Sequence, residues 1–456
     1  MNIPKSIFKA YDIRGIVGAE LTAEIVKLIG LAIGTESIKC GERGVVIGRD
    51  GRLSGVEMLA ALKSGLKQSG CHLVDIGMVP TPLVYFAAAT TAATSAVMIT
   101  GSHNPPEYNG FKIMIAGETL SGERIAALYQ RILAADFSTG HGTTTQANIE
   151  QDYINRITSD IKLQRPLSVV LDCGNGVAGE IAPKLFAALG AKVSKLFCLI
   201  DGNFPNHHPD PSKPENLQDL IKKVLETGAD MGFAFDGDGD RLGLIDNKGN
   251  IIWADRQMIL YSRDILKRHK KAKIVFDVKC SALLPKDISK HGGEPIISRT
   301  GHSFIKAKIK QTGAALGGEM SGHIFFKERW FGFDDALYTG ARLLEIMSKT
   351  DKTCAQIFEN LPSSISTPEI NITFKQPGQQ FEAMEKLSKS VDFPNAKITT
   401  IDGVRVDYDN GWGLVRPSNT TPCLVLRFEA DSQKTLEEIQ AKFKTWLGQN
   451  HIVFDY

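Results

Sequence analysis

Residues 96–105 read Ala96-Val97-Met98-Ile99-Thr100-Gly101-Ser102-His103-Asn104-Pro105, an apolar run followed by a polar turn. The apolar run is typical of a buried strand, and Asn-Pro is a turn signal. Ser102 is therefore expected on a loop at the carboxyl end of a strand, where open α/β sheets bind ligands. A hydroxyl group there, next to His103, is a candidate nucleophile. The alternative is an ordinary turn in which Ser and Asn make local hydrogen bonds.

The same order of elements occurs three times along the chain. Each segment alternates short apolar strands with helices and closes with an apolar strand that runs into a polar loop; the segments span residues 45–100, 168–236 and 273–319. Such alternation predicts α/β units with largely parallel strands. Unless the likeness among the segments is coincidental, we expect three similar α/β domains with mixed, largely parallel sheets, arranged around a central cleft where their strand-end loops meet.

The C-terminal part of the chain has a different pattern. Two strand-like runs flank Asp409-Asn410-Gly411, a hairpin signal, and Ser432 precedes an amphipathic helical pattern at residues 436–447. This pattern predicts a smaller α+β domain with an antiparallel sheet, and a linker is expected near Leu361-Pro362-Ser363-Ser364. The predicted domains are residues 1–150, 151–252, 253–364 and 365–456.

The second segment ends in a run of alternating aspartates, Asp236-Gly237-Asp238-Gly239-Asp240. Three carboxylates separated by flexible glycines can turn toward one small hard cation. The calcium-binding EF-hand pattern fails, because Arg241 and Asn247 stand where it needs Gly and Glu. A surface acidic turn is the alternative, although three close like charges need a counter-charge. The run predicts a Mg²⁺ site that also bridges to a phosphate oxygen, with Arg241 within reach of that phosphate.

Two further loops carry polar groups that suit a phosphorylated sugar. In Gly317–His323, Glu319 and Ser321 are two residues apart and project to one side of an extended loop, where they suit neighbouring sugar hydroxyls. His323 could transfer a proton. Residues 416–422, Arg-Pro-Ser-Asn-Thr-Thr-Pro, offer a guanidinium, hydroxyls, an amide and backbone N–H groups to a phosphate. The alternatives are a glycine-rich turn and a plain polar loop.

Residues 174–179, Gly-Asn-Gly-Val-Ala-Gly, support a rival function. They match the dinucleotide fingerprint G-x-G-x-x-G, lie between a predicted strand and a helix, and are followed by Asp201. An NAD-dependent oxidoreductase is therefore an alternative, but it leaves the aspartate run, Ser102 and residues 416–422 without a role. A carbohydrate-binding module without catalysis is a third possibility, and it would not need the aspartates.

Composition narrows the class of protein. The 456 residues are 43% hydrophobic and 23% charged, with a net charge of +2, so no strong basic field indicates nucleic-acid binding. The longest uncharged stretch, residues 76–103, is interrupted by prolines and makes a poor membrane span. The seven cysteines are scattered and the N-terminus lacks a signal-peptide pattern, which favours reduced thiols in the cytoplasm. We expect a monomer that binds neither nucleic acid nor membranes.

Five motifs in family order resemble the α-D-phosphohexomutase family, and most closely its bacterial phosphomannomutase/phosphoglucomutase branch. They are FKAYDIRG (8–15), TGSHNPPEYNGFKI (100–113), DGDGDR (236–241), GEMSGH (318–323) and RPSNTT (416–421). The resemblance covers nearly the whole chain and implies four domains around one cleft. It also implies a reversible transfer of phosphate between C1 and C6 of mannose and glucose phosphates, with hexose 1,6-bisphosphate as intermediate and activator. Phosphoglucosamine mutase, from the same family, is the alternative.

The resemblance also implies roles for individual residues. Ser102 would carry a phosphoryl group in the resting enzyme, and Mg²⁺ would be bound by that phosphate together with Asp236, Asp238 and Asp240. Glu319 and Ser321 match the sugar-contact pair. The site for the substrate's existing phosphate matches Arg416, Ser418, Asn419 and Thr420, and further cleft positions match Tyr11, Arg14, Lys112, Lys279, His302 and His323.

The implied catalysis is largely electrostatic. Arg241 and nearby cations would spread the charge of the transfer, and the last domain is expected to close over the substrate to exclude water. Arg14, Lys112 and His323 all remain candidates for the general base, although Arg is a poor base.

Overall fold

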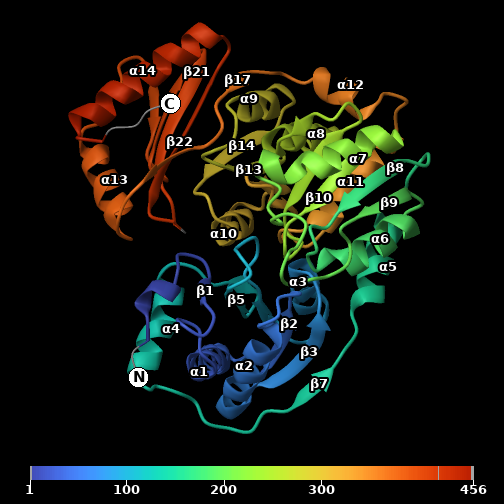
Figure 1. Ribbon diagram of the computed structural model, residues 1–456, viewed down its shortest axis with the longest axis vertical. Helices are drawn as coiled ribbons and strands as arrows, with labels where there is room; N and C mark the ends of the chain where they lie inside the picture. The colour runs from blue at the N-terminus through green and yellow to red at the C-terminus, as the bar shows by residue number, and fades with distance from the viewer. Residues whose placement is uncertain (1–2, 420, 453–456) are drawn as a thin grey trace.

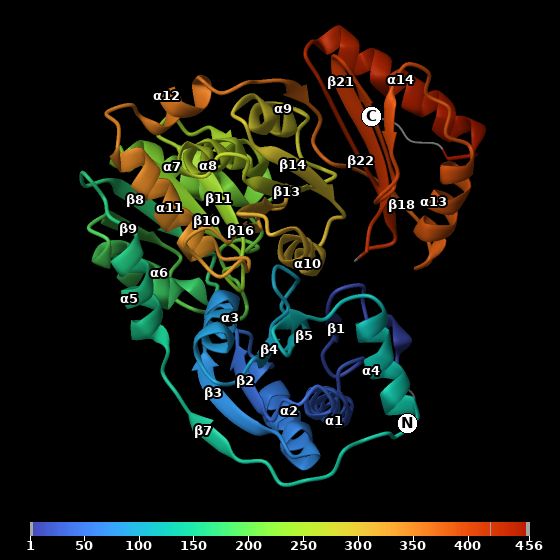
Figure 2. The ribbon, with the colours of Figure 1, turned by 180° about the vertical axis from the view of Figure 1, so that it is seen from behind.

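The computed structural model describes residues 3–419 and 421–452 of the chain. These residues form four domains, each built on one sheet (Figure 1). Domain 1 lies below domains 2 and 3, and domain 4 stands to one side of domain 3 (Figures 1 and 2). Three mixed, largely parallel sheets and a fourth, antiparallel sheet confirm the predicted fold class.

Domain 1 has a sheet in the order β1-β5-β4-β2-β3-β7, with β6 paired to β5. β4, β2, β3 and β7 run parallel, and β5 runs antiparallel to β1, β4 and β6. α2 ends at Gly70, whose φ of 102° gives a left-handed helix cap. The elements are η1 Lys5–Ile7, β1 Ile13–Ile16, α1 Ala23–Lys39, β2 Gly44–Arg49, α2 Gly55–Ser69, β3 His72–Met78, α3 Thr81–Thr90, β4 Ser95–Ile99, β5 Tyr108–Ile115, β6 Glu118–Thr119, α4 Glu123–Leu133 and β7 Thr144–Gln146.

Domain 2 has a sheet in the order β12-β11-β10-β8-β9. The strands β10, β8 and β9 run parallel, and the β10–β11 pair is an antiparallel hairpin whose turn carries the aspartate run. The elements are α5 Glu150–Asp160, β8 Ser168–Asp172, α6 Ala178–Ala188, β9 Lys192–Leu196, η2 Pro214–Leu217, α7 Gln218–Thr227, β10 Met231–Phe235, β11 Leu242–Asp246 and β12 Ile251–Ile252.

Domain 3 has a sheet in the order β14-β13-β15-β16, with only the last pair antiparallel. The loop between β15 and β16 contains Glu319, Ser321 and His323. The elements are α8 Ala254–Arg268, β13 Lys273–Asp277, α9 Leu283–Lys290, β14 Glu294–Ser298, α10 His302–Thr312, β15 Leu316–Gly318, β16 Ile324–Phe326, α11 Ala336–Ser348 and α12 Cys354–Glu359.

Domain 4 has an antiparallel sheet in the order β17-β22-β21-β20-β19, with β18 paired to β22. Ser432 caps α14 by accepting a hydrogen bond from the backbone N–H of Thr435, as the sequence predicts. The elements are β17 Ile365–Ser366, β18 Ile370–Thr373, α13 Gln379–Lys389, β19 Lys397–Thr399, β20 Val404–Tyr408, β21 Gly411–Pro417, β22 Cys423–Ala430 and α14 Gln433–Gln449.

The clusters of buried apolar residues show which domains share a hydrophobic core. One apolar cluster runs through domains 2 and 3 and reaches α3 of domain 1, while the opposite face of the domain 1 sheet has a core of its own. Domain 4 has a separate core, and a small apolar cluster around Val278, Trp412 and Leu414 lies between it and domain 3. Among the described residues, no helix is both long enough and apolar enough to cross a membrane.

Candidate active site

Ser102 lies just beyond the carboxyl end of β4, as predicted, but it is buried rather than exposed, with 2% of its surface accessible. Its φ of 51° is left-handed, which is uncommon for a residue with a side chain. Its Oγ is 3.2 Å from His103 Nδ1 and donates to Asp236 Oδ2 at 3.2 Å. Burial, Arg241 and Arg14 lower the pKa of His103 well below its usual range, so this imidazole is neutral.

A buried arginine holds the loop that carries Ser102. The Arg52 guanidinium, 1% exposed, donates to the backbone carbonyls of Ser102, Asn104, Pro105 and Tyr108 at 2.6–2.9 Å. Arg52 also pairs with Asp50, which accepts a hydrogen bond from Thr100 Oγ1 at 2.7 Å. Thr100 Oγ1 in turn accepts from the Ser102 backbone N–H at 2.7 Å. The loop conformation is therefore fixed by one connected network.

The aspartate run faces this loop. Asp236, Asp238 and Asp240 are fully buried, and one oxygen from each lies within 4.8 Å of the others. Burial and the other two aspartates raise the pKa of Asp236 well above its usual range. Burial alone would also raise the pKa of Asp238, but the Lys112 ammonium and the Thr81 hydroxyl hold it below its ordinary value. Three carboxylates are thus crowded beside one lysine.

These aspartates fit a metal ion. Within the described part of the chain, Asp238 Oδ1 and Asp240 Oδ1 are buried without a hydrogen-bond partner. Buried carboxylate oxygens are costly unless they are paired or coordinated, and a hard divalent cation would satisfy them. The cluster could therefore hold a metal ion next to the Ser102 hydroxyl.

Two further cations lie around Ser102. The Arg14 guanidinium donates to Asn104 Oδ1 at 2.7 Å and pairs with Asp12 at 2.5 Å. Lys112 pairs with Asp238 at 2.6 Å and also with Asp240. Although burial alone would lower it, these two carboxylates raise the pKa of Lys112 well above its usual range. Lys112 is therefore an ammonium in this arrangement, suited to neutralising charge or donating a proton.

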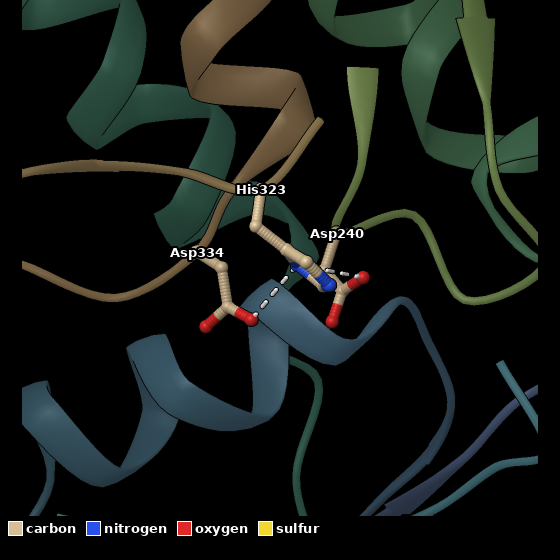
Figure 3. A group of neighbouring side chains, drawn as sticks. All are labelled: Asp240, His323 and Asp334. Atoms are coloured by element: carbon tan, nitrogen blue, oxygen red, sulfur yellow. Dashed lines mark ion pairs between the residues drawn. The ribbon is translucent and has the colours of Figure 1, made fainter. Parts of the chain in front are cut away.

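His323 connects domain 3 to this centre (Figure 3). Its Nε2 accepts a hydrogen bond from Arg241 Nε at 2.9 Å, so Nδ1 carries the proton. Nδ1 lies 3.3 Å from Asp334 Oδ2 and 3.4 Å from Asp240 Oδ1 (Figure 3). Against the effect of burial, Lys306 and His323 hold the pKa of Asp334 well below its usual range. Asp334 is therefore an anion that fixes the orientation of the imidazole.

The predicted sugar-contact pair comes together in the β15–β16 loop. Glu319 is buried, and its Oε1 accepts from the Gly301 backbone N–H at 2.5 Å. Ser321 Oγ donates to Glu319 Oε2 at 3.2 Å. His302, at the start of α10, lies edge-on to Tyr11 of domain 1 with ring centroids 5.3 Å apart. Domains 1 and 3 therefore meet at these residues.

Domain 4 adds the loop that follows β21. Arg416 Nε donates to Asp402 Oδ2 at 3.0 Å, and the same carboxylate oxygen accepts from the Thr300 backbone N–H of domain 3 at 3.0 Å. Ser418 is buried and its Oγ accepts from Thr421 Oγ1 at 2.9 Å. Asn419 is half-buried, and Thr420 lies outside the described residues.

A second bridge connects domain 4 to domain 3. Lys279 Nζ pairs with Glu369 at 2.8 Å, and Glu369 stands at the beginning of domain 4. Among the predicted site residues, Arg14 and Lys112 lie within the strands β1 and β5. Others lie in loops that follow strands, namely Ser102, Asp236, Asp238, Asp240, Lys279, Glu319 and Ser321.

Family models match almost the entire chain. They are phosphoglucomutase/phosphomannomutase alpha/beta/alpha domain I at residues 5–139, domain II at 151–249, domain III at 253–365 and the C-terminal domain at 369–445.

The chain belongs to the phosphoglucomutase/phosphomannomutase family.

Individual relatives agree with this membership. The phosphomannomutase/phosphoglucomutase of Pseudomonas aeruginosa is 56% identical over 445 residues, which cover 98% of this chain and 96% of that protein. The crystal structure of a Burkholderia thailandensis phosphoglucomutase/phosphomannomutase family protein has a TM-score of 0.94 and 50% identity, covering 99% of this chain and 98% of that one. A complex of Aspergillus fumigatus N-acetylphosphoglucosamine mutase with GlcNAc-6P and magnesium shares the fold, with a TM-score of 0.63 and 13% identity. The protein is an α-D-phosphohexomutase, an isomerase.

Membership in the phosphohexomutase family removes the support for the rival functions. Residues 174–179 do lie between β8 and α6, as a dinucleotide fingerprint would. In this phosphohexomutase, however, the segment packs against the aspartate turn: the Val177 backbone N–H donates to the Gly237 carbonyl at 3.1 Å. Gly176 lets the backbone of this segment approach the backbone of Gly237, because an added Cβ would come too close to the Gly237 carbonyl. The oxidoreductase alternative is not favoured, and neither is a module without catalysis.

Three residues of this phosphohexomutase site were missed by the sequence reasoning. Arg52 follows β2, whose carboxyl end lies beside that of β4, so its place after a predicted strand was a usable signal. Asp334 and Asp402 had no such signal, because each reaches its partner only through the packing of distant segments.

Proposed function

We propose that Ser102 is the phosphoryl carrier in a reversible transfer of phosphate between C1 and C6 of glucose and mannose phosphates. The observation that carries this proposal is the 3.2 Å contact between Ser102 Oγ and Asp236 within a buried cluster of carboxylates and cations. A phosphate on this hydroxyl would lie beside the three carboxylates. Asp236, Asp238, Asp240 and that phosphate would hold Mg²⁺, whose charge would offset the charge of the transferred group.

The transfer proceeds in two steps. The phosphoserine P–Oγ bond breaks while a sugar hydroxyl oxygen forms a bond to phosphorus, and the hydroxyl proton passes to a base. Hexose 1,6-bisphosphate results; it turns over and returns its other phosphate to Ser102, so added bisphosphate acts as an activator. Arg14, Lys112 and His323 remain the candidate proton carriers, and His103 and Arg241 complete the polar surroundings of the reacting hydroxyl.

Domains 3 and 4 are proposed to bind the sugar phosphate. Glu319 and Ser321 are proposed to hold sugar hydroxyls, because their oxygens lie side by side at 3.2 Å. Arg416, Ser418, Asn419 and Thr420 are proposed to hold the phosphate that does not react. Tyr11, Lys279 and His302 are proposed to line the same space, since they stand where domain 1 meets domain 3 and domain 3 meets domain 4.

The proposal also covers the domain boundaries, the oligomeric state and the cellular location of the protein. We place the domain boundaries near residues 150, 252 and 364, and expect a monomer located in the cytoplasm that binds neither nucleic acid nor membranes. Light scattering on a sizing column measures the molar mass in solution and tests the monomer.

The decisive experiment replaces Ser102 with alanine. We expect Ser102→Ala to fold but to lose about 100-fold or more of its activity toward glucose 1-phosphate, because the covalent route is removed. Peptide mapping of the active enzyme should find one phosphate on the Ser102 peptide. Ser6→Ala, at an exposed serine, is the matched control and should stay active. Full activity of Ser102→Ala, or a phosphate on another residue, would disprove the proposal.

A further inference from the structure

Two cysteines outside the proposed site lie side by side. Cys173 follows β8 directly and Cys198 lies two residues beyond β9, the parallel neighbour of β8 (Figure 1). The Cys173 backbone N–H donates to the Leu196 carbonyl at 3.1 Å, and the two sulfur atoms are 3.5 Å apart. A disulfide has an S–S length of about 2.0 Å, so the two sulfur atoms would have to move closer together by about 1.5 Å to bond.

The two thiols differ in accessibility and acidity. Cys173 is fully buried, whereas Cys198 is partly exposed. The contact between the two sulfur atoms lowers the pKa of Cys198, and the same contact together with burial raises the pKa of Cys173 well above its usual value. The thiolate therefore forms first on Cys198, the more exposed of the two residues.

We propose that Cys173 and Cys198 are a modification site, a dithiol that peroxides convert reversibly to a disulfide, and that the disulfide lowers mutase activity. In the first step the Cys198 sulfur attacks hydrogen peroxide, the O–O bond breaks, and sulfenic acid and water form. In the second step the Cys173 sulfur attacks the sulfenic sulfur, the S–O bond breaks, and a second water leaves with the Cys173 proton. Two thiols and one peroxide thus give one disulfide and two waters, and a dithiol reductant reverses the change.

The segment that follows Cys173 leads to the aspartate turn. The Cys173 carbonyl accepts from the Gly176 backbone N–H at 2.6 Å, and the next residue, Val177, donates to the Gly237 carbonyl at 3.1 Å. Gly237 is packed so closely on the Ser102 carbonyl that an added Cβ would overlap it. Drawing Cys173 toward Cys198 would therefore move a segment that touches the aspartate turn, and the turn touches the Ser102 loop.

The segment that contains Cys198 leads to the same loop from the other side. Asn175 ties the two segments together, since its backbone N–H donates to the Phe197 carbonyl and its side chain donates to the Leu199 carbonyl, both at 2.8 Å. Further along, the Phe204 ring lies 5.2 Å from the Arg52 guanidinium. Arg52 holds the Ser102 loop through four carbonyls, so both cysteines lie on segments that contact the machinery around Ser102.

The first test detects the bond itself. The reduced full-length protein is treated with hydrogen peroxide, its remaining thiols are alkylated, and its mass and peptides are measured without reductant. We expect a loss of two hydrogens and a linked pair of peptides containing Cys173 and Cys198. Cys198→Ser should abolish the link, while Cys40→Ser, at an exposed cysteine, should leave it unchanged. Complete alkylation of both cysteines after peroxide treatment, or oxidation of Cys198 to a sulfonic acid without a link, would overturn the site.

The second test measures the consequence. Because a displacement of about 1 Å in a catalytic group can cost about 100-fold in rate, we expect the linked enzyme to lose about tenfold or more of its activity. Dithiothreitol should restore it, and Cys198→Ser should keep its activity in peroxide. Should Cys198→Ser fold poorly, Cys198→Ala provides the same comparison. Unchanged activity of the fully linked enzyme would overturn the coupling, and this outcome is distinct from failure of the Ser102 proposal, which Ser102→Ala tests in reduced protein.

Discussion

Ser102 adopts a left-handed backbone conformation, which is uncommon for a residue with a side chain. A left-handed φ at a residue with a side chain costs about 1–3 kcal/mol and persists only when the surroundings enforce it. Here the enforcing group is Arg52, whose donors occupy four carbonyls of the loop, supported by Asp50 and Thr100. Arg52 therefore fixes the loop of Ser102, the proposed phosphoryl carrier, without contacting the Ser102 hydroxyl group.

Replacing Arg52 with lysine tests this positioning role. A lysine keeps the charge but cannot reproduce the planar set of donors. We expect Arg52→Lys to lower kcat about tenfold or more and to change the KM for glucose 1-phosphate less than about threefold, because substrate binding falls to other domains. Steady-state kinetics measures both constants. Arg124→Lys, in an exposed pair with Glu118, is the control. If Arg52→Lys raised KM by as large a factor as it lowered kcat, the result would argue against a positioning role for Arg52.

Arg416 is expected to act on binding instead. Its Nε is engaged by Asp402, which aims the guanidinium from the end of β21. A charged hydrogen bond to phosphate contributes about 1.5–3 kcal/mol, so we expect Arg416→Ala to raise the KM for hexose phosphates about tenfold or more. The exposed Lys389, paired with Glu385 in the same domain, provides the control Lys389→Ala. An unchanged KM would place the phosphate elsewhere.

At the scale of the element, the hairpin of β10 and β11 explains how three aspartates come together. The two strands are in antiparallel register from Phe235 and Leu242 onward, so residues 236–241 must turn within a short distance. Gly239 takes the left-handed φ of 74° that this turn requires. The turn thereby forces the three carboxylates into one buried space, where they repel one another unless cations are present.

Removing one of these carboxylates should weaken metal binding. We expect a chelator to stop turnover and added Mg²⁺ to restore it in the unmodified enzyme. Asp238→Asn should need about tenfold or more Mg²⁺ for half-maximal activity, since it loses charge and a ligand oxygen together. Asp219→Asn, at an exposed aspartate of α7, is the control. Activity of Asp238→Asn that is unaffected by chelator would show that the turn is purely structural.

At the scale of the whole molecule, domain 4 is the domain that we expect to move. Its core is separate from the others, and its links to domain 3 include the Lys279–Glu369 pair and the hydrogen bond from Thr300 to Asp402. Contacts of this kind can break and re-form, while the cores of domains 2 and 3 are continuous. We therefore expect domain 4 to close over the bound sugar and exclude water from the phosphoserine.

The two orientations that we propose for the bound bisphosphate predict the range of sugars. The half-turn that exchanges C1 and C6 lets O3 and O4 roughly exchange places, so one pair of groups, Glu319 and Ser321, can serve both. O2 meets different surroundings in each pose, which leaves no room for a tight pocket. Because glucose and mannose differ only at C2, we expect their kcat/KM values to agree within about 10–200-fold.

To test this, kcat/KM is measured for glucose 1-phosphate, mannose 1-phosphate and glucosamine 1-phosphate in one assay. Glucosamine 1-phosphate should be the poorest of the three, because its ammonium group lacks an evident carboxylate partner. A preference for it of more than about 1,000-fold, near 4 kcal/mol, would reassign the substrate and leave the mutase mechanism intact.

Local chemistry in the sequence was enough to predict most elements and the loops that follow them. Ser102 follows the buried apolar strand β4, and Ser432 caps α14, because these features depend on residues close together in the chain. The positions of Ser102, the aspartates and Arg416 at strand ends follow from the same reasoning. The order of five motifs then indicated the family.

Only the tertiary structure decided which distant groups share a site. Arg52 reaches a loop 50 residues away, His323 orients on Asp334, and Asp402 joins Arg416 to domain 3. The burial of Ser102 and the contact between Cys173 and Cys198 likewise depend on how separate segments pack. Such contacts have no local signature, because the energy that favours them comes from burial and pairing across the folded chain rather than from the conformational preference of any one segment.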